Sequence, residues 1–380
     1  MRILTLTHEF PPIGGGGGRI AFELARRMAG LGHHVEVITS GNPRLPAAEE
    51  VGGFLVRRVS QRQTHLAYST NLEKLAYVRA ASRELNLRSS AQFDVVHAHF
   101  ILPAGLIAQR QHGDTPYIIT CHGSDVPGHN PHEGQLEHRL LKSLWHRIAD
   151  DASAIVSPSE NLRELILNAG PNLLRTLHRI PNGYPCGKFR PTAGHDKILM
   201  VSRLIPLKGF HYFLQGIAGI DLGFEVNIVG DGPMHKELKA LAAQTPTQVI
   251  FHGWLDNDSD ELRELFETCS IFVFPSEAEN FPTVLLEAMD AGQAIVTTDV
   301  KGCPEVAGEA AVTVPPRSPH ALREAVQALI ADPNARSRIG RQARQRVREE
   351  FDWTVIEARY QELYEALQRP GRKARGVCFA

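Results

Sequence analysis

The sequence predicts an α/β protein made of two Rossmann-like halves, each built on a parallel sheet. Short apolar runs alternate with helical stretches along most of the chain, which is the pattern of parallel strands joined by crossover helices. The length of 380 residues exceeds one ordinary core. A segment rich in proline and glycine, 179–187, interrupts the alternation near the middle of the chain, and the alternation then restarts.

The run Ile271–Phe274 is apolar throughout, as in a parallel strand that is covered on both faces. In the first half we expect strands at 2–7, 35–39, 94–99, 117–120 and 154–157, and helices at about 19–31, 103–111, 137–149 and 161–170. In the second half we expect strands at 198–202, 225–229, 249–251, 271–274, 294–297 and 311–314, and helices after Gly209, at 233–243, 261–268 and 282–291, and three more between 319 and 368.

The composition is that of an ordinary globular protein. Lys and Arg (41) nearly balance Asp and Glu (42), so the charge gives no reason to expect a nucleic acid partner. The five cysteines show no C-x-x-C spacing, which predicts neither disulfides nor structural zinc and fits a reducing cytoplasm. No apolar run reaches membrane-spanning length. Six arginines of the first half are interpreted as a solvated face, with a docking patch as the alternative: Arg57, Arg58, Arg62, Arg79, Arg83 and Arg88.

A glycine loop follows the first strand. Five glycines, 14–18, stand between that strand and the next helix, where backbone N–H groups can approach a ligand closely. The spacing is not that of the dinucleotide fingerprint, and the second strand is followed by Ser40 and Gly41 rather than by the acidic residue that the fingerprint requires. We interpret the loop as a ligand contact, with a merely flexible loop as the alternative.

Two glutamates lie near the strand 271–274. Glu279 is on the loop after this strand, and Glu287 lies within a short apolar helix that follows. A carboxylate in such a helix needs a hydrogen-bonding partner, or its pKa rises until it is neutral. Both side chains can border the crevice at the carboxyl end of the strand, where ligands of open α/β sheets bind. The alternative is a solvated Glu279 and a structural Glu287.

Basic residues, glycines and histidines follow other strands. Arg203 and Lys208 share a strand-to-helix loop and suit a diphosphate, and Gly230 ends the next strand. His122 follows the strand 117–120 and is a candidate for the same rim. His97 and His99 share a strand face, but no third ligand stands at metal-binding spacing, so no metal site is predicted.

Eight motifs in order resemble the retaining GT-B glycosyltransferases of the large E-x7-E family (glycosyltransferase family 4-like, "glycosyl transferases group 1"). The resemblance covers nearly the whole chain. The motifs are the glycine loop with Arg19, His122 to Asp125, Ser159 to Asn161, Pro181 to Gly183, Arg203 with Lys208 and Gly209, Gly230 to Pro233, Glu279 with Glu287, and Gly302 to Glu305. Asn280 and Lys301 replace glycines that are usual in this family.

The resemblance implies a GT-B fold, in which two Rossmann-like domains with parallel sheets face a central cleft. We expect an N-terminal acceptor-side domain at 1–184, a linker at 185–195 and a nucleotide-sugar-binding domain at 196–350. A C-terminal helix within 351–380 would cross back to the first domain and end in a basic tail.

The resemblance also implies roles for single residues. Arg203 and Lys208 would grip the donor diphosphate, Glu287 the ribose hydroxyls, and Glu279 the transferred sugar. His122 would lie beside that sugar from the opposite domain. Further donor contacts are expected from Gly16, Gly17, Gly230, Asn280, Phe281, Thr283 and Val284, and His252 to Asp256 would hold the base.

The implied reaction is metal-independent transfer of a hexosyl group from a UDP- or GDP-sugar, with retention through a same-face displacement. No tightly bound cofactor is expected. A lipid-linked acceptor, with peripheral contact at the inner face of a membrane, would suit the basic first half, and a soluble sugar acceptor fits equally. The alternatives are a nucleotide-sugar 2-epimerase of the same fold and a non-catalytic nucleotide-sugar-binding protein; a dehydrogenase is disfavoured because the dinucleotide fingerprint is missing.

Overall fold

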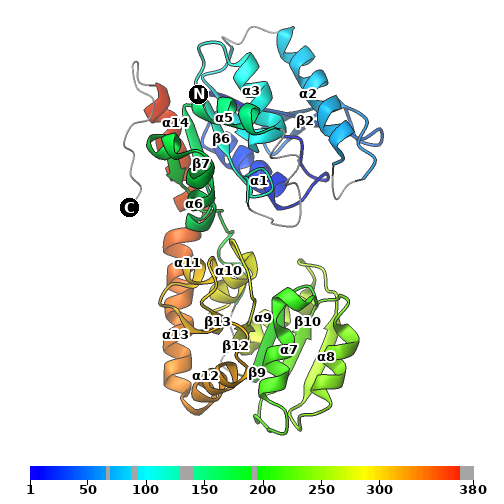
Figure 1. The fold of residues 1–380 in the computed structure, drawn as a ribbon, viewed down its shortest axis with the longest axis vertical. Helices are drawn as coiled ribbons and strands as arrows, with labels where there is room; N and C mark the ends of the chain where they lie inside the picture. Colours follow the sequence, from blue (N-terminus) through cyan, green and yellow to red (C-terminus); the bar gives the residue numbers. More distant parts are fainter. Residues whose placement is uncertain (66–68, 88–91, 129–140, 191–194, 369–380) are drawn as a thin grey trace. The chain divides into compact units, whose positions relative to one another are not determined.

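The computed structural model describes residues 1–65, 69–87, 92–128, 141–190 and 195–368. The chain forms two compact units (Figure 1). Unit 1 comprises Met1–Gly183 and the segment from Ile356 onward, and unit 2 comprises Tyr184–Val355. The expected basic tail, Arg88 and residues 191–194 of the expected linker lie outside the described residues.

Unit 1 is built on an eight-stranded sheet in the order β3-β4-β2-β1-β5-β6-β7-β8. Every neighbouring pair is parallel except β3 and β4, which form an antiparallel hairpin. The strand order reverses at β1, between β2 and β5, so the crevice beside the carboxyl end of β1 is the expected ligand position. The strands are β1 (Arg2–Leu6), β2 (His34–Ser40), β3 (Ala48–Val51), β4 (Phe54–Ser60), β5 (Val95–His99), β6 (Tyr117–Thr120), β7 (Ala154–Ser157) and β8 (Leu177–Arg179).

Helices bury apolar side chains against both faces of this sheet. One face carries a core formed with α2, α3, α5 and α6, which includes Tyr77, Ile107, Trp145 and Ile166. α1 and α14 are joined by an ion pair between Arg27 and Glu357 (3.3 Å). The helices are α1 (Gly16–Gly30), α2 (Asn71–Asn86), α3 (Leu106–Gln111), α5 (Lys142–Asp151), α6 (Glu160–Ala169) and α14 (Trp353–Gln368), and the segment Ile101–Gly105 before α3 is kinked at Leu102, whose backbone is extended.

Several features of unit 1 differ from the sequence predictions. The β3–β4 hairpin, α2 and β8 were not expected: burial alternates along β3 and β4, α2 buries only one face, and β8 has only three residues. α1 begins at Gly16 rather than near Arg19, so three glycines lie in its first turn. Arg58 is buried instead of solvated, and its guanidinium donates to Glu49 (2.5 Å) and to the Pro11 carbonyl (3.2 Å).

The Glu73 carboxylate at the start of α2 should stabilise the fold in a way that depends on pH. Burial opposes ionisation of Glu73, but hydrogen bonds from Thr70 and Thr64 outweigh it and lower the pKa of this carboxyl to about 2. Because the folded-state pKa lies below the ordinary 4.5, the stabilisation is complete above pH 4.5 and is lost as the pH falls toward 2. In urea unfolding, Glu73→Gln should lower the free energy of unfolding at pH 6. The difference in this free energy from the wild type should shrink as the pH falls from 4.5 toward 2. A difference that does not change between pH 6 and 2.5 would contradict this assignment.

Unit 2 is built on a fully parallel six-stranded sheet in the order β11-β10-β9-β12-β13-β14. The order reverses at β9, between β10 and β12, so the loops after β9 and β12 flank the expected ligand crevice. The strands are β9 (His195–Val201), β10 (Glu225–Val229), β11 (Val249–Gly253), β12 (Cys269–Phe274), β13 (Ala294–Thr298) and β14 (Ala311–Val314).

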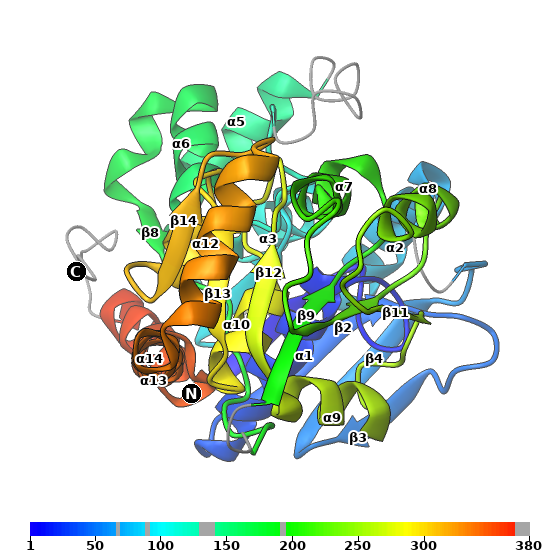
Figure 2. The ribbon, with the colours of Figure 1, turned by 90° about the horizontal axis from the view of Figure 1, so that it is seen from below.

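Helices cover both faces of this second sheet as well (Figure 2). One core includes residues of α7, α8 and α12, and the other includes residues of α9, α10, α11 and α13. The helices are α7 (Phe210–Gly216), α8 (His235–Ala242), α9 (Asp260–Thr268), α10 (Thr283–Asp290), α11 (Cys303–Ala307), α12 (Pro319–Ala331) and α13 (Pro333–Arg346).

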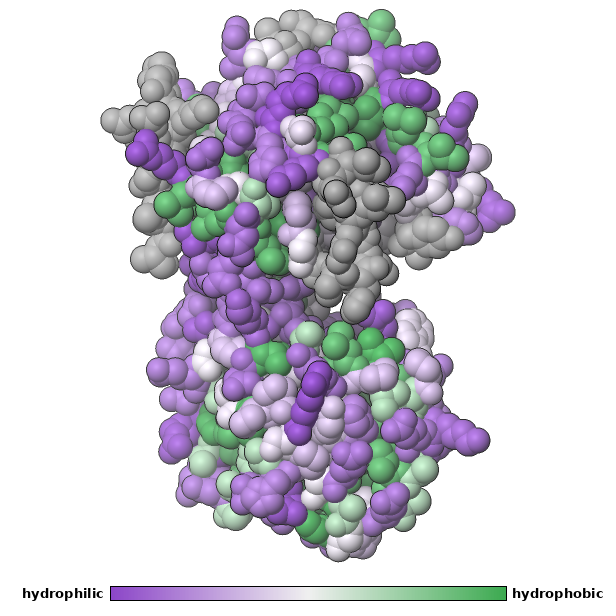
Figure 3. Space-filling view, in the orientation of Figure 1, coloured by the Kyte–Doolittle hydropathy of each residue, from purple (hydrophilic) through white to green (hydrophobic). Residues whose placement is uncertain are grey.

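The surface of unit 2 along α13 is hydrophilic (Figure 3). This helix is rich in arginine, but three of its guanidiniums bind backbone carbonyls of their own unit: Arg336 donates to Leu329 (3.1 Å), Arg344 to Phe189 (3.2 Å) and Arg346 to Val306 (2.9 Å). The described cysteines Cys121, Cys186, Cys269 and Cys303 are unpaired thiols. Among the described helices, none has both the length and the apolar character needed to cross a membrane.

Candidate functional site

The loops after β9 and β12 are bound to each other by hydrogen bonds. The Glu277 N–H donates to the Leu207 carbonyl (2.8 Å), and the Ser276 hydroxyl donates to the same carbonyl (3.1 Å). Gly209 has a φ of +70°, and a Cβ there would collide with the Pro275 carbonyl oxygen. Only glycine allows the two loops to approach this closely. The two motifs that the sequence places on separate strands therefore form one wall of a single site.

Lys208 and Glu279 meet at the centre of this wall. The Lys208 ammonium donates to the Glu279 carboxylate, and both side chains are largely buried. The ammonium also lies 5.5 Å from the centroid of the Phe274 ring. A buried ion pair that faces a ligand crevice can exchange its partner for a diphosphate, whose oxygens provide the same charge-assisted hydrogen bonds.

Arg203 lies on the same loop as Lys208, near its start. Its side chain is exposed, and within the described part of the chain its guanidinium has no hydrogen-bond or ion-pair partner. An exposed arginine beside a crevice keeps all five N–H donors available for an anion. The loop thus offers one cation that is already paired and one that is free.

Glu287 and Asp290 of α10 have opposite surroundings. Asp290 is fully buried and accepts hydrogen bonds from the backbone N–H groups of Gly187 (2.9 Å) and Lys188 (2.9 Å). Glu287 is half-buried and has no hydrogen-bond partner in the described residues. Burial raises the pKa of Glu287, against the opposing effect of Lys188. Asp290 is therefore the structural anchor of this helix, and the Glu287 carboxylate is available to a ligand.

The other predicted donor contacts of unit 2 lie around the same loops. Gly230 directly follows β10, and its N–H donates to the Gly253 carbonyl (2.7 Å). Asn280 and Phe281 belong to the loop before α10, and the Phe281 ring lies 5.8 Å from that of Phe351. Thr283 and Val284 form the first turn of α10, which has no side-chain cap. Their N–H groups find no acceptor within the helix and can bind an anion.

His122 of unit 1 lies in a row of stacked histidines. Its Nε2 is 3.0 Å from Nδ1 of His99, and the two rings stack with centroids 5.2 Å apart. The His97 ring stacks on His99 at 4.5 Å, and its two nitrogens contact Thr120 (2.8 Å) and Tyr364 of α14 (2.7 Å). The pair that the sequence places on one strand face therefore supports His122.

These histidines are neutral at physiological pH. Burial lowers the pKa of His122 to about 4 and that of His97 to about 3, and burial also places the pKa of His99 well below its ordinary range. Nε2 of His99 is buried without a partner. A buried N–H without an acceptor is rarer than an unused lone pair, so the His99 proton belongs on Nδ1 and is donated to His122. His122 then carries its own proton on Nδ1, as a hydrogen-bond donor.

The loop of His122 is held in place by Asp125. One carboxylate oxygen accepts from the N–H groups of His122 (3.0 Å) and Gly123 (3.1 Å), and the other accepts from the Ile101 N–H (2.8 Å). The carboxylate joins the loop after β6 to the loop after β5. The second of these loops also contains Phe100, whose positive φ of 76° is uncommon for a residue other than glycine.

The glycine loop contacts these aromatic residues. A Cβ at Gly17 would lie 2.6 Å from the Phe100 ring and 3.0 Å from the His122 ring, whereas a Cβ at Gly16 would meet nothing within 4 Å. The predicted loop residues Gly16 and Gly17 therefore differ: Gly17 is required by close packing beside His122, and Gly16 is not.

This difference gives a matched pair of variants. Gly17→Ala should destabilise the protein by about 1–3 kcal/mol, because the added methyl must displace the Phe100 and His122 rings. Gly16→Ala should be neutral or slightly stabilising, because alanine is a better helix former and the position is open. Urea unfolding measures both. Equal stability of the two variants would contradict the packing described here.

Comparisons with known proteins identify the family of this chain. Residues 188–346 match the model of "Glycosyl transferases group 1", and residues 14–188 match that of "Glycosyltransferase Family 4". The chain belongs to the GT-B glycosyltransferases of the family 4-like type. This confirms the fold class and the family predicted from the sequence.

Individual relatives of this glycosyltransferase span its full length. The glycogen synthase of Mycobacterium tuberculosis is 29% identical, over 98% of this chain and 96% of the relative. Among solved structures, sucrose-phosphate synthase from Thermosynechococcus elongatus superposes with a TM-score of 0.74 at 21% identity, over 96% of this chain and 98% of that one. The Anabaena protein HepE, in complex with UDP-glucose, superposes with a TM-score of 0.68 at 18% identity, over 96% of this chain and all of that one.

Sequence reasoning missed several residues that support the glycosyltransferase site. Asp290 was not singled out, although an aspartate near the end of an apolar helix is a signal that could have been used. His8 and Phe100 were not singled out either; their rings lie 4.8 Å apart, and Phe100 lies 4.6 Å from His122. Only the tertiary structure brings these loops together.

Proposed function

We propose that this glycosyltransferase moves a hexosyl group from a nucleoside diphosphate sugar to an acceptor hydroxyl, with retention of configuration and without a divalent metal. The observation that carries the proposal is the convergence of Lys208, Glu279 and Arg203 on two hydrogen-bonded loops beside Glu287. Two cations, two carboxylates and the uncapped start of α10 suit a ligand with a diphosphate and several hydroxyls.

The role proposed for each side chain follows from its charge and from whether it is available to the ligand. Arg203 and Lys208 stabilise the negative charge that develops on the departing diphosphate, so that two fixed cations take the place of a metal ion. Glu287, which has no hydrogen-bond partner among the residues that the structure describes, accepts hydrogen bonds from the ribose hydroxyls. Glu279 exchanges Lys208 for hydroxyls of the transferred sugar. His122 as a donor to that sugar stays a prediction from the family resemblance.

The proposed step is a same-face displacement at the anomeric carbon. The bond from this carbon to the diphosphate oxygen breaks, and its electron pair leaves with the nucleoside diphosphate. The acceptor oxygen bonds to the same face of the carbon, and its proton passes to the departing diphosphate oxygen. No carboxylate of the described site is assigned as a covalent nucleophile.

A screen of nucleotide sugars tests the proposal. UDP-, GDP- and ADP-sugars are added to the full-length protein, and thermal unfolding is followed. A donor at 100 times its dissociation constant should add roughly 2.7 kcal/mol to the free energy of unfolding. Transfer from the stabilising donor to a panel of sugars is then measured with and without EDTA, and NMR of the product gives its anomeric configuration.

A different experimental result would refute each part of the proposal. Product of inverted configuration would refute retention, and loss of turnover in EDTA would refute metal independence. Conversion of the donor into its epimer without an acceptor would indicate a nucleotide-sugar 2-epimerase instead. Binding without any turnover would indicate a binding protein.

A further inference from the structure

A cavity lies in unit 1, and none of the predicted site residues described above lines it. Its volume is about 560 Å³, within the usual range for small-molecule sites of roughly 300–1,000 Å³. Three loops line it: that after β1 through Pro12, that after β2 through residues 42–45, and that after β4 through residues 61–64. Because β1, β2 and β4 are parallel, these loops lie at the same edge of the sheet as the glycine loop, which begins two residues after Pro12.

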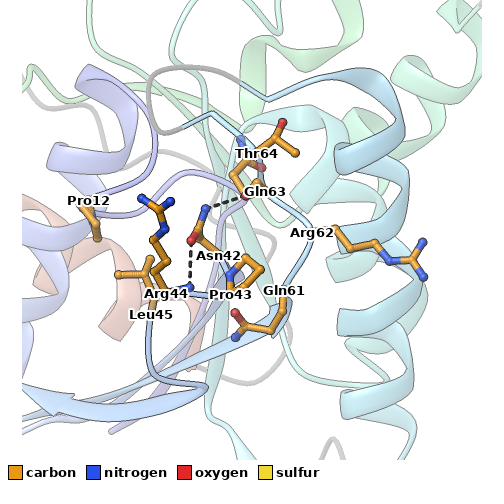
Figure 4. A pocket seen from close by; sticks show the side chains of 9 residues that line it. All are labelled: Pro12, Asn42, Pro43, Arg44, Leu45, Gln61, Arg62, Gln63 and Thr64. Atoms are coloured by element: carbon orange, nitrogen blue, oxygen red, sulfur yellow. Dashed lines mark hydrogen bonds between the residues drawn. The ribbon is translucent and has the colours of Figure 1, made fainter.

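The side chains that line the cavity are basic or neutral. Its nine lining residues include Arg44 and Arg62 and no Asp or Glu. Neither guanidinium has a hydrogen-bond or ion-pair partner within the described residues. Figure 4 shows the Arg44 side chain extending between Pro12 and Asn42, whereas that of Arg62 points away from the other lining side chains. Arg44 is therefore the cation placed to meet a ligand in the cavity.

The walls of the cavity are fixed by hydrogen bonds. The Asn42 side chain donates to the Gln63 carbonyl (2.7 Å) and accepts from the Arg44 N–H (2.9 Å), as the dashed lines in Figure 4 show. The buried Arg58 donates to the Pro11 carbonyl, next to Pro12. The backbone that carries Arg44 is thus held before any ligand arrives, which lowers the entropic cost of binding.

We propose that this cavity binds an anionic group, a phosphate or a carboxylate, of the acceptor, and that Arg44 is its principal contact. The inference rests on the proposed transfer reaction and adds the chemical class of the acceptor to it. Arg44 has no partner in the described part of the chain, lies at the ligand edge of the sheet and has no carboxylate beside it in the lining. It therefore offers the planar fork that binds phosphate and carboxylate through two hydrogen bonds.

Titration calorimetry of the full-length protein tests the assignment with pairs of probes that differ in charge. Glucose 1-phosphate and glucose 6-phosphate are compared with glucose, and L-malate serves as the carboxylate probe. At least one anionic probe should bind with an affinity about 10-fold or more above that of glucose. Arg44→Ala should weaken that probe by about 10- to 100-fold, as expected for a lost charge-assisted pair, and Arg44→Lys should fall between.

Two further variants distinguish binding in the cavity from attraction of the anion by general surface charge. Arg62→Ala should have a smaller effect than Arg44→Ala, because its side chain points away. Arg110→Ala, an exposed arginine on α3 outside the cavity, should have none. The proposal is overturned if no anionic probe is preferred over glucose, or if Arg44→Ala and Arg110→Ala behave alike.

The test of the cavity can fail or succeed independently of the test of the proposed function. If no donor supports transfer but Arg44→Ala abolishes anion preference, the cavity stands and the transfer reaction fails. If transfer to neutral sugars proceeds and Arg44→Ala changes neither binding nor acceptor choice, the reaction stands and the cavity inference fails. A titration with UDP shows in both cases whether unit 2 remains intact.

Discussion

Lys208→Ala and Arg203→Ala should each lower kcat by about 10²- to 10³-fold. Both cations are proposed to stabilise charge that appears on the diphosphate only as the sugar leaves, and removal of one such group typically has an effect of this size. Lys208→Ala also leaves the Glu279 carboxylate without its ion-pair partner. Its loss should therefore be at least as large as that of Arg203→Ala, whose guanidinium has no protein partner among the described residues.

Steady-state kinetics with the donor found in the screen measures these effects. Lys236→Ala is the matched control, because Lys236 is an exposed lysine of α8 in the same unit. Urea unfolding shows whether each variant is folded. Near-normal turnover of both Lys208→Ala and Arg203→Ala would refute the assignment of the diphosphate site.

Glu287→Ala and Glu279→Ala should differ in their effect on the binding of free nucleoside diphosphate. Glu287→Ala should weaken it by about 10- to 100-fold, because hydrogen bonds to a charged group are lost. Glu279→Ala should leave it unchanged or strengthen it, because Lys208 is released from its ion pair and becomes available to the phosphates. Turnover should fall in both variants.

Calorimetry with UDP and GDP, alone and as sugar conjugates, distinguishes the two carboxylates. Glu279→Gln is the appropriate control, since it removes the charge and keeps the shape. Equal losses of free-nucleotide affinity in Glu279→Ala and Glu287→Ala would contradict the division of roles.

Apolar runs in the sequence are sufficient to place the strands that carry the site. β6, β10 and β12 lie where the sequence predicts them because most of their residues are apolar and buried. β4 alternates between buried and half-buried residues, and α2 exposes Leu72, so neither gives a strong signal. The start of α1 was misplaced because close packing of Gly17 against Phe100 and His122 overrides the low helix propensity of glycine.

The sequence by itself determined the family, the two α/β halves, and the residue types at the strand ends, because burial and loop chemistry are local properties. Only the tertiary structure decided which of these residues meet. Lys208 and Glu279 are 71 positions apart, and Asp290 anchors a segment 103 positions earlier. Glu287, on the same helix as Asp290, has no hydrogen-bond partner among the described residues. Such contacts depend on how loops and helix faces pack across the sheet, which local periodicity does not encode.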